Sequence, residues 1–484
     1  MFTPAIHPQR APWSHWRLVE NFGHSIRVPA QVFQPATVEQ LADLFARARR
    51  ENVAIALRGS GRSYGDAAMR QGHWVLDLRR MNRILAWDPK TGEITVEPGV
   101  TIEQLWRYVL PDGWWPAVVP GTMRPTMGGC VAMNVHGKNN WHAGTFGEHV
   151  TRLRVLTPAG DEYELTPDDP RFHTFVGGLG VLGVATSITL RLKRVASGNL
   201  DVHAWAVPDL AHMLADLDTY KDRYEYIVGW VDSTAMGWAR GRGQIHAANH
   251  VPEGEELYPE RTLSPDYQVL PDVFFGFVPK AWMWRFMRPF MTNWGVRLVN
   301  SAKYWASRWL SHHKTYRQAL VAFNFLLDYI PNWERAYRGR GLIQYQIFVP
   351  RDEALRVFNE VLRYTQQRGM PSYLAVVKRH RADAFLLSHG VDGYSLALDF
   401  PVWPGKERDL VAMLHELDRL VLDAGGRFYF AKDATLTPDT AAAFLGEQAL
   451  RTFFELKATW DPEDRLQTDL YRRVFAPLRS RLAA

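Results

Sequence analysis

The sequence predicts an α+β protein of two domains, and three observations support this prediction. The chain has 484 residues, which is more than one hydrophobic core usually holds. Up to about residue 194, capped helices alternate with short strand-like runs. Beyond that point, long aromatic and charged segments alternate with strand-like runs. We therefore expect a first domain at 1–194, a second at 195–425 and a mostly helical tail at 426–484.

Local signals place the elements of the first domain. Thr37 and Gln40 have capping-box spacing at the start of a helix that Asn52 can end. Thr101 and Gln104 begin a second capped helix. The apolar positions of the first helix fall on one face, namely Leu41, Leu44, Phe45 and Ala48. Short β-rich runs predict strands at 53–57, 73–78, 84–88, 93–99, a pair over 152–166, and 183–195.

In the second domain and the tail, fewer sequence patterns predict strands or helices, but these patterns are longer. The runs "LIQYQIFVP" and "YSLALDFPV" predict two strands. A strong amphipathic helix begins at Glu407 and is stopped by Gly425 and Gly426. In the tail, "DPEDRLQTDLYRR" at 461–473 predicts a docked helix.

Composition narrows the class of function. The net charge is +6 and the pI about 9.2, which suits an anionic cofactor, a phosphorylated substrate or an acidic membrane surface, but not nucleic acid by itself. The single cysteine, Cys130, excludes an intramolecular disulfide. There is no P-loop, H-E-x-x-H or C-x-x-C pattern, so we expect no metal. Nor do we expect a signal peptide or a transmembrane helix, and the predicted location is cytoplasmic or peripheral to a membrane.

The stretch "LRGSGRSYGD" at 57–66 allows two interpretations. "GRSYG" matches the G-x-S-x-G pattern of a hydrolase nucleophile, Ser63. That motif needs a helix behind the serine, and "DAAMRQG" supplies barely one turn. We therefore favour a backbone cradle for a phosphate-bearing cofactor, to which Arg58 and Arg62 add charge and the serines add hydroxyls. A structural turn and a hydrolase remain as alternatives.

Two further glycine-rich stretches follow. Gly178, Gly180 and Gly183 form a G-x-G-x-x-G pattern, but a strand rather than a helix is predicted after it, which argues against an NAD site. The stretch "PGTMRPTMGGCVAMNVHGKNNWHAGTFGEHV" holds six glycines, with His136 and Lys138 among them. Such a composition favours backbone packed against a flat ligand.

In this order, "RGSGRSYGD", "PGT…TMGGCVAMNVHGKN" and "GGLGVLGVATSITL" resemble the vanillyl-alcohol-oxidase (PCMH-type) FAD-binding fold. With "HAGTFGEHV", "LPDVF", "NWERAY", "LIQYQIFVP", "LALDFP" and "GGRFYFAKD", the chain resembles more narrowly the family of oxidase subunits of decaprenylphosphoryl-β-D-ribose 2′-epimerase. The resemblance implies an FAD domain, a substrate (cap) domain built on a β-sheet, and a tail that returns to the FAD domain.

The resemblance also implies site residues. The flavin contacts would be Arg58, Gly59, Ser60, Gly61, Arg62, Ser63, Tyr64, Gly121, Thr122, Gly128, Gly129, Cys130, Asn134, His136, Gly137, Gly183 and Tyr429. The substrate would meet Gln344, Gln346, Lys378, Asn324, Ala397 and Lys432. Lys432 and His136 are the catalytic candidates, Lys432 as a cation near the flavin or the substrate and His136 for contact with the sugar.

Two departures from the family pattern matter. Covalent members of the broad fold carry His in a G-H-S arrangement, whereas Arg62 stands there in "GRS", so we predict non-covalent FAD. Ala397 precedes "LDFP" where mycobacterial relatives have Cys, and Asn324 stands where they have Tyr. These two differences bear on the exact sugar.

The segment 280–317 has eight Lys or Arg, five Trp and no Asp or Glu. We define it as the basic aromatic segment and expect Pro289 and Gly295 to break its helical pattern. Its composition suits an anionic membrane surface, with an internal helix pair as the plainer alternative. A platform for single-stranded nucleic acid is a weaker interpretation, and we expect no nucleic-acid partner.

These inferences predict an FAD-dependent oxidoreductase acting on a sugar CH–OH group. By the resemblance, it would convert the 2′-hydroxyl of a polyprenyl-phosphoryl ribose into a ketone, which an NAD(P)H-dependent reductase would turn into the arabinose epimer for bacterial cell-wall arabinan. The alternatives are a soluble polyol or aldonolactone oxidase and a non-catalytic lipid-binding flavoprotein subunit.

Overall fold

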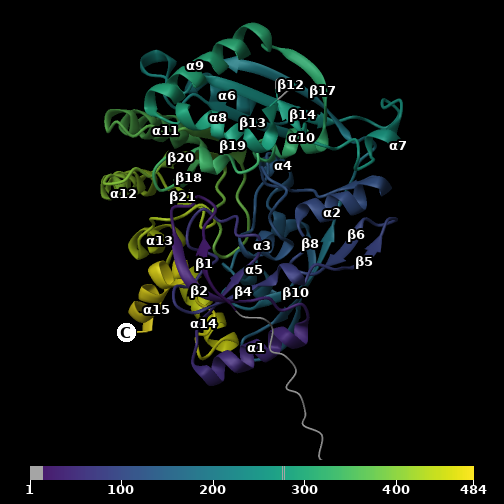
Figure 1. The fold of residues 1–484 in the computed structure, drawn as a ribbon, viewed down its shortest axis with the longest axis vertical. Coiled ribbons are helices and arrows are strands. Elements are labelled where there is room, and N and C mark those ends of the chain that lie inside the picture. The colour runs from purple at the N-terminus through teal and green to yellow at the C-terminus, as the bar shows by residue number, and fades with distance from the viewer. Residues whose placement is uncertain (1–14, 275, 277, 484) are drawn as a thin grey trace, which may run out of the picture.

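The computed structural model describes residues 15–274, 276 and 278–483, and it has the α+β composition that the sequence predicts. Its upper part in Figure 1 is built on one eight-stranded sheet, and its lower part holds a four-stranded and a five-stranded sheet. The helices of the tail, drawn in yellow, lie against the lower part (Figure 1). The chain therefore visits the lower part, then the upper part, and then returns.

The two sheets of the lower part come from the first 194 residues. The four-stranded sheet has the order β1 (His15–Glu20), β2 (Arg27–Phe33), β4 (Trp74–Asp77), β3 (Ile55–Arg58). The five-stranded sheet has the order β5 (Ile84–Asp88), β6 (Glu93–Val96), β10 (Val184–Arg191), β8 (Val150–Leu156), β9 (Glu162–Leu165). A short pair joins β7 (Trp114–Trp115) to β11 (Lys193–Arg194). Strands β1 and β2 lie in a region for which no strand was predicted.

The predicted helix caps are confirmed. Thr37 accepts from the Gln40 amide at the start of α1 (Val38–Glu51), and Asn52 ends that helix in the left-handed conformation with φ of 54°. Helix α2 (Ile102–Val109) begins with the complete capping box of Thr101 and Gln104. Three short helices complete this region: α3 (Met127–Ala132), α4 (Asn140–Ala143) and α5 (Pro170–Phe175). The four predicted apolar residues of α1 are all buried.

The fold agrees with the interpretation of two glycine motifs, G-x-S-x-G around Ser63 and G-x-G-x-x-G at 178–183. No helix stands between Gly59 and His73, so Ser63 lacks the strand–turn–helix geometry of a nucleophile elbow. Strand β10 begins directly after Gly183, so the G-x-G-x-x-G pattern precedes a strand, as predicted.

The eight-stranded sheet is antiparallel at each pairing and spans most of the upper part. Its order is β17 (Lys314–Ala319), β12 (Asn199–Val207), β14 (Gly243–His250), β13 (Tyr226–Val231), β19 (Leu374–His380), β20 (Gly393–Pro401), β18 (Leu342–Pro350), β21 (Arg427–Phe428). Three amphipathic helices pack on it: α6 (Leu210–Tyr220), α11 (Arg351–Gln367) and α12 (Glu407–Asp423). Smaller elements complete this part: α7 (Pro259–Thr262), α10 (Leu320–Asn324), and the hairpin of β15 (Val273–Phe274) and β16 (Val278–Pro279).

The basic aromatic segment forms α8 (Met283–Met287) and α9 (Asn293–Leu310), which pack on the upper part. Pro289 lies between these helices, as predicted, but Gly295 does not break the pattern. It lies in the first turn of α9, where a Cβ would stand 2.4 Å from the Phe290 carbonyl oxygen. Within the described ranges no helix is long and apolar enough to cross a membrane.

The tail is mostly helical, with α13 (Pro438–Leu445), α14 (Glu447–Trp460) and α15 (Ala476–Ala483). The predicted helix over 461–473 is wrong for most of its length, because helical backbone begins only at Asp469. Residues of this stretch instead pair with β3: the Ile55 amide donates to Arg465 and the Gln467 amide donates to Ile55. The buried Lys457 ammonium holds the turn by bonding to Asp461 and to the Leu466 carbonyl.

Candidate active site

A cavity of about 530 Å³ lies between the glycine-rich loops of the lower part and one face of the eight-stranded sheet. All three predicted glycine stretches reach its wall, and so do the tail residues Tyr429 and Lys432. The other wall consists of side chains from β13, β14, β18, β19 and β20. Segments far apart in the sequence therefore enclose one site.

The first glycine stretch leaves β3 and lines the cavity with its seven residues Arg58 to Tyr64. Gly59 packs so closely that a Cβ there would stand 2.1 Å from the Thr126 hydroxyl oxygen. Gly61 has φ of +64°, the left-handed region that favours glycine. The Arg58 guanidinium braces this loop by donating to the carbonyls of Ala68 and Glu20. These features make the loop a backbone surface rather than a side-chain site.

The other glycine stretches complete that surface. Gly121, Thr122, Gly128 and Gly129 line the cavity beside the first loop. Gly183 also lines it, and a Cβ there would stand 2.9 Å from the Leu156 carbonyl oxygen.

The residues present fit FAD. Closely packed glycine backbone faces the cavity, and Arg58 and Arg62 add positive charge there for a pyrophosphate. The buried Arg62 Nε has no hydrogen-bond partner in the described chain, which leaves a donor for a bound group. Two aromatic residues, Phe22 and Tyr64, also line this part of the cavity. The Arg62 guanidinium lies 5.2 Å from the ring centre of Phe22, and Tyr64 is buried.

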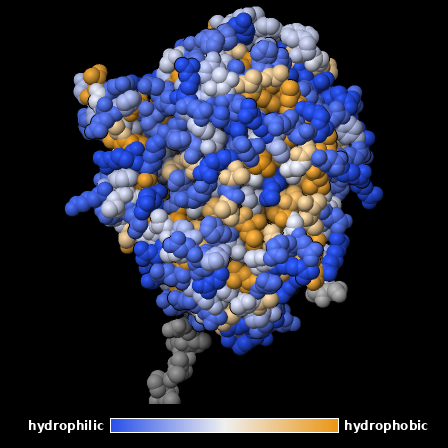
Figure 2. All heavy atoms as spheres, turned by 180° about the vertical axis from the view of Figure 1, so that it is seen from behind, coloured by the Kyte–Doolittle hydropathy of each residue, from blue (hydrophilic) through white to orange (hydrophobic). Residues whose placement is uncertain are grey.

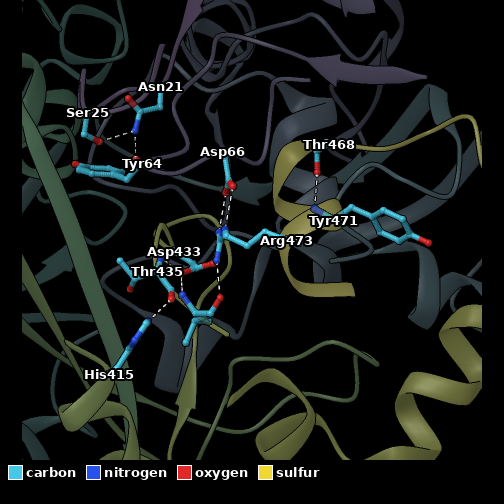
Figure 3. Close-up of polar contacts among 11 residues, drawn as sticks. Asn21, Ser25, Tyr64, Asp66, His415, Asp433, Thr435, Thr468, Tyr471 and Arg473 are labelled. Carbon is cyan, nitrogen blue, oxygen red and sulfur yellow. Dashed lines mark hydrogen bonds and ion pairs between the residues drawn. The ribbon is translucent and has the colours of Figure 1, made fainter. Parts of the chain in front are cut away.

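An arginine of the tail joins the first glycine loop to the loop that carries Lys432. Arg473 donates to Asp66 from Nε at 3.0 Å and from Nη2 at 2.8 Å, and Nη2 also lies 2.9 Å from Asp433 (Figure 3). The Tyr64 amide donates to the Ala431 carbonyl at 2.9 Å. We call this arrangement the Arg473 clamp. It fixes the position of Lys432 against the cofactor loop.

Lys432 lies beside Tyr64, with its ammonium nitrogen 3.8 Å from the centre of the ring. Burial lowers the pKa of Lys432 from its ordinary value, and the charge of Asp399 offsets part of that shift. Asp399 is fully buried and accepts a hydrogen bond from the Gln344 amide. Burial raises the pKa of Asp399, and the hydrogen bond from Gln344, the charge of Lys432 and a hydrogen bond from Tyr337 offset part of that shift. Lys432 is therefore a cation that gives up its proton more easily than an exposed lysine.

His136 is a neutral hydrogen-bonding group in the cavity wall. Burial first, and then the charge of Lys378, hold its pKa well below the ordinary value. The Gln346 amide nitrogen lies 3.1 Å from Nε2, and because an amide nitrogen only donates, Nε2 is the acceptor. The proton then sits on Nδ1, which has no partner in the described chain. The ring packs against His389 and Tyr429.

Strand register explains why the predicted substrate residues share one face of the sheet. Gln346 of β18 pairs with Ala397 of β20, and Ala397 pairs with Val376 of β19. Gln344 and Lys378 stand two residues away on their strands, so their side chains point the same way. All five predicted wall residues, Gln344, Gln346, Lys378, Ala397 and Lys432, line the cavity.

Four predicted site residues are not brought to the cavity wall. Cys130 is buried within α3, on the apolar side of that helix. The side-chain oxygen of Asn134 accepts a hydrogen bond from the backbone N–H of Gly147 at 2.9 Å. Gly137 packs so tightly that a Cβ would lie 2.6 Å from Asn139 Oδ1. Asn324, expected to bind substrate, donates to the Leu320 carbonyl at 3.1 Å, and its own carbonyl accepts from Lys138.

Other residues of the site escaped the sequence prediction. Lys138, His246 and Lys303 line the cavity, and Asp399 lies directly behind Gln344. Asp399 stood within the quoted motif "LALDFP", two residues after Ala397, so strand periodicity was a signal for it. His246 and Lys303 had no such signal, because only the tertiary fold brings β14 and α9 to the cavity.

Comparison with known proteins agrees with this geometry. The model of a family described as the FAD binding domain matches residues 29–166. The chain is 31% identical over 474 residues, 94% of its length, to 96% of the decaprenylphosphoryl-β-D-ribose oxidase of Mycolicibacterium smegmatis. It is 28% identical over 200 residues to L-gulonolactone oxidase of Bos taurus, covering 41% of this chain and 44% of that protein. It is 27% identical over 169 residues to D-arabinono-1,4-lactone oxidase of Yarrowia lipolytica, covering 34% and 32% respectively.

Proposed function

Because the chain belongs to the family of FAD-dependent oxidoreductases that includes decaprenylphosphoryl-β-D-ribose oxidase, we propose that it oxidises the 2′-hydroxyl of a polyprenyl-phosphoryl ribose to a ketone. Sugar oxidation with FAD is the general activity of this family. The choice of a lipid-linked ribose as the substrate is the finer step that the following observations support.

The extent of the similarity carries the proposal. The match to the M. smegmatis oxidase spans 94% of the chain, so it includes the eight-stranded sheet that forms one wall of the cavity. The matches to the two lactone oxidases span 41% and 34% of it. Substrate specificity lies in the residues that face the substrate, so the longer match favours a lipid-linked sugar over a soluble aldonolactone or polyol.

The side chains around Lys432 can handle the proton of this reaction. Oxidation of a secondary alcohol releases the hydroxyl proton, and a hydrogen with its electron pair leaves the carbon. FAD, when bound, supplies the acceptor for that hydrogen and electron pair. Neutral Lys432 takes the hydroxyl proton, and the negative charge of Asp399 stabilises the resulting ammonium. Gln346, whose side chain is oriented by its hydrogen bond to His136, then offers its amide oxygen to a neighbouring hydroxyl of the sugar.

The outer surface of the basic aromatic segment supports contact with a lipid surface. Trp294 and Trp309 of α9 are 73% and 74% exposed. Leu298, Trp305 and Leu310 of the same helix are also exposed. Hydrophobic residues gather in patches on the face of the molecule opposite to that of Figure 1 (Figure 2). Aromatic side chains beside basic ones favour an interface with anionic headgroups, where a polyprenyl chain would be held.

The product determines the class of the next enzyme. A 2′-keto sugar becomes the arabinose epimer when hydride is delivered to the opposite face of the carbonyl. We therefore propose a separate NAD(P)H-dependent reductase as the functional partner, so that the pair acts as an epimerase in cell-wall sugar synthesis.

An anaerobic reduction experiment tests the proposal. The flavin absorbance of the purified holoenzyme is followed after addition of a short-chain prenyl-phosphoryl ribose, an aldonolactone or a simple polyol. Bleaching by the prenyl-phosphoryl ribose alone supports the proposal. Bleaching by the lactone or polyol alone would favour the soluble oxidase. A flavin that none of these compounds reduces would contradict the proposal and favour a lipid-binding flavoprotein subunit.

A further inference from the structure

The cavity wall is positively charged along its whole length. Among the described residues that line it, six are Lys or Arg and none is Asp or Glu. Arg58 and Arg62 lie at the cofactor loops, and Lys432 lies at the site of oxidation. The remaining three, Lys138, Lys303 and Lys378, lie on the side of the eight-stranded sheet. A neutral sugar has no need of these additional cations.

Lys138 is committed to the protein itself. Its ammonium donates to the carbonyls of Phe323 and Asn324 and lies 4.6 Å from the ring centre of Phe323. Lys303 and Lys378 differ, since neither ammonium has an ion pair or hydrogen bond with a described residue. The Lys303 ammonium lies over Trp230, 3.9 Å from the ring centre, which fixes its position at the wall. Two cations are thus available to a ligand.

His246 of β14 stands near Lys303. It pairs with Val228 of β13, and both residues line the cavity, as does Trp230 two positions further along β13. Burial first, and then the nearby charges of Lys303 and Lys138, lower the pKa of His246 to about 4. His246 is therefore a neutral imidazole, which offers one N–H donor beside the ammonium of Lys303.

The strand order β18, β20, β19, β13, β14 places the wall residues across the sheet in the order Gln346, Ala397, Lys378, Trp230 and His246. Lys378 stands two residues from Val376, which pairs with Ala397, so Lys378 lies nearer to Ala397 and Gln346 than His246 does, and its charge acts on His136 and Lys432. The charge of Lys303 acts on His246. Lys303 belongs to α9 and reaches into the cavity, where burial lowers its pKa to about 8, whereas Trp305 and Trp309 of the same helix face solvent. One helix therefore borders both the cavity and the surface.

We propose that Lys303 and His246 form a binding site for a phosphate attached to the substrate sugar, where α9 borders the cavity. This inference rests on the proposed function, because it assigns the anionic part of the same substrate. Lys303 supplies a charge-assisted hydrogen bond, His246 a neutral one, and Lys378 of β19 favours the anion by its charge. The lipid then leaves the cavity along α9.

Matched variants of Lys303 test the site. K303M removes the charge at similar length, K303R retains it, and K314M removes an exposed lysine of the same segment that does not line the cavity. We expect K303M to raise the concentration of prenyl-phosphoryl ribose for half-maximal flavin reduction by about tenfold or more, with the limiting rate unchanged. K303R should restore much of the affinity, and K314M should behave as the unmodified enzyme.

Two further substrates identify what the site binds. Methyl β-D-ribofuranoside carries no phosphate, so K303M should not change its reaction. Ribose 1-phosphate carries the phosphate without lipid, and weaker binding to K303M would show that the phosphate is recognised whatever its source. The affinities of the unmodified enzyme for the two phosphorylated compounds then distinguish a lipid-linked from a free sugar phosphate. If K303M binds each phosphorylated compound as tightly as the unmodified enzyme does, the inference is overturned.

Direct binding separates this inference from the proposed function. A prenyl phosphate without sugar is titrated into the holoenzyme and its binding measured by calorimetry, which needs no turnover. If no sugar reduces the flavin but K303M and H246L still weaken prenyl phosphate binding, the proposed function fails and the phosphate site stands. H246Q should bind better than H246L because it keeps a neutral N–H donor. If K303M and H246L both bind prenyl phosphate as tightly as the unmodified enzyme, the inferred phosphate site is wrong.

Discussion

The ammonium of Lys432 lies 3.8 Å from the centre of the Tyr64 ring, a contact that joins the tail of the chain to the first glycine loop at the cavity wall. We expect K432M to retain FAD, because the glycine loops do not depend on this side chain. Without a proton acceptor, the rate of flavin reduction by substrate should fall by about 100-fold or more. Stopped-flow absorbance measures the rate, and K90M, at an exposed turn, serves as the control. Normal turnover of K432M would remove Lys432 from the mechanism.

The rate of flavin reduction should increase with pH as Lys432 loses its proton. Burial lowers the pKa of Lys432, so the increase should occur below the pH at which an exposed lysine titrates. Asp399 raises the pKa of Lys432, and D399N removes that effect, so the midpoint of the increase should move to lower pH. The pH profile of kcat/KM measures this midpoint. A shift to higher pH in D399N would contradict the assignment of Lys432 as the proton acceptor.

The Arg473 clamp should stabilise both the fold and the bound cofactor. R473M leaves Asp66 and the buried Asp433 without their partner, so the free energy of unfolding should fall by about 2 to 4 kcal/mol. FAD should also dissociate more readily, since the loop around Tyr64 loses its support. Urea denaturation and flavin fluorescence measure the two effects. R481M breaks an exposed pair with Asp439 and should change neither. Equal stability of R473M and R481M would refute a structural role for the clamp.

FAD should leave the protein when the fold is destroyed. Arg62 stands where covalent relatives of the broad fold carry histidine, and a guanidinium offers no comparable attachment point for the flavin. Precipitation with acid should therefore release yellow flavin into the supernatant, where its absorbance is read. Flavin that stays with the washed pellet would show a covalent link and overturn this prediction.

The exposed tryptophans of α9 should determine binding to anionic membranes. We expect the protein to float with vesicles that contain an anionic lipid, and W294S/W309S to reduce the bound fraction by about tenfold. W238S provides a matched control, because Trp238 is 85% exposed but lies outside the basic aromatic segment. Failure of the unmodified protein to float, or an equal loss with W238S, would exclude α9 as the membrane contact.

Local sequence signals predicted the parts of the fold that depend on neighbouring residues. The caps at Thr37 and Thr101 are examples, because each cap bonds within its own first turn. The same kind of signal gave a wrong prediction for 461–473, because the backbone of this stretch pairs with Ile55 of β3, far away in the sequence. Helical spacing in that stretch could not reveal a competing tertiary partner.

For the candidate site too, local sequence patterns predicted some residues but not those that only tertiary packing brings to the cavity. Glycine loops and motif residues such as Gln344 and Lys432 are recognisable because their neighbours in sequence form the pattern. Lys303 and His246 were not, because their position depends on the packing of α9 against β12 and β14. The effect of Asp399 on Lys432 likewise depends on burial, which no local pattern specifies.

The eight-stranded sheet interrupts the cofactor unit in the sequence without interrupting it in space. The chain leaves that unit after β11 and is joined to it again where Tyr64 meets Ala431 and Arg473 meets Asp66. This sheet is thus an insert between two halves that already recognise each other. A chimaera could exchange the insert for that of another oxidase while keeping both halves, and so redirect the choice of alcohol without rebuilding the redox centre.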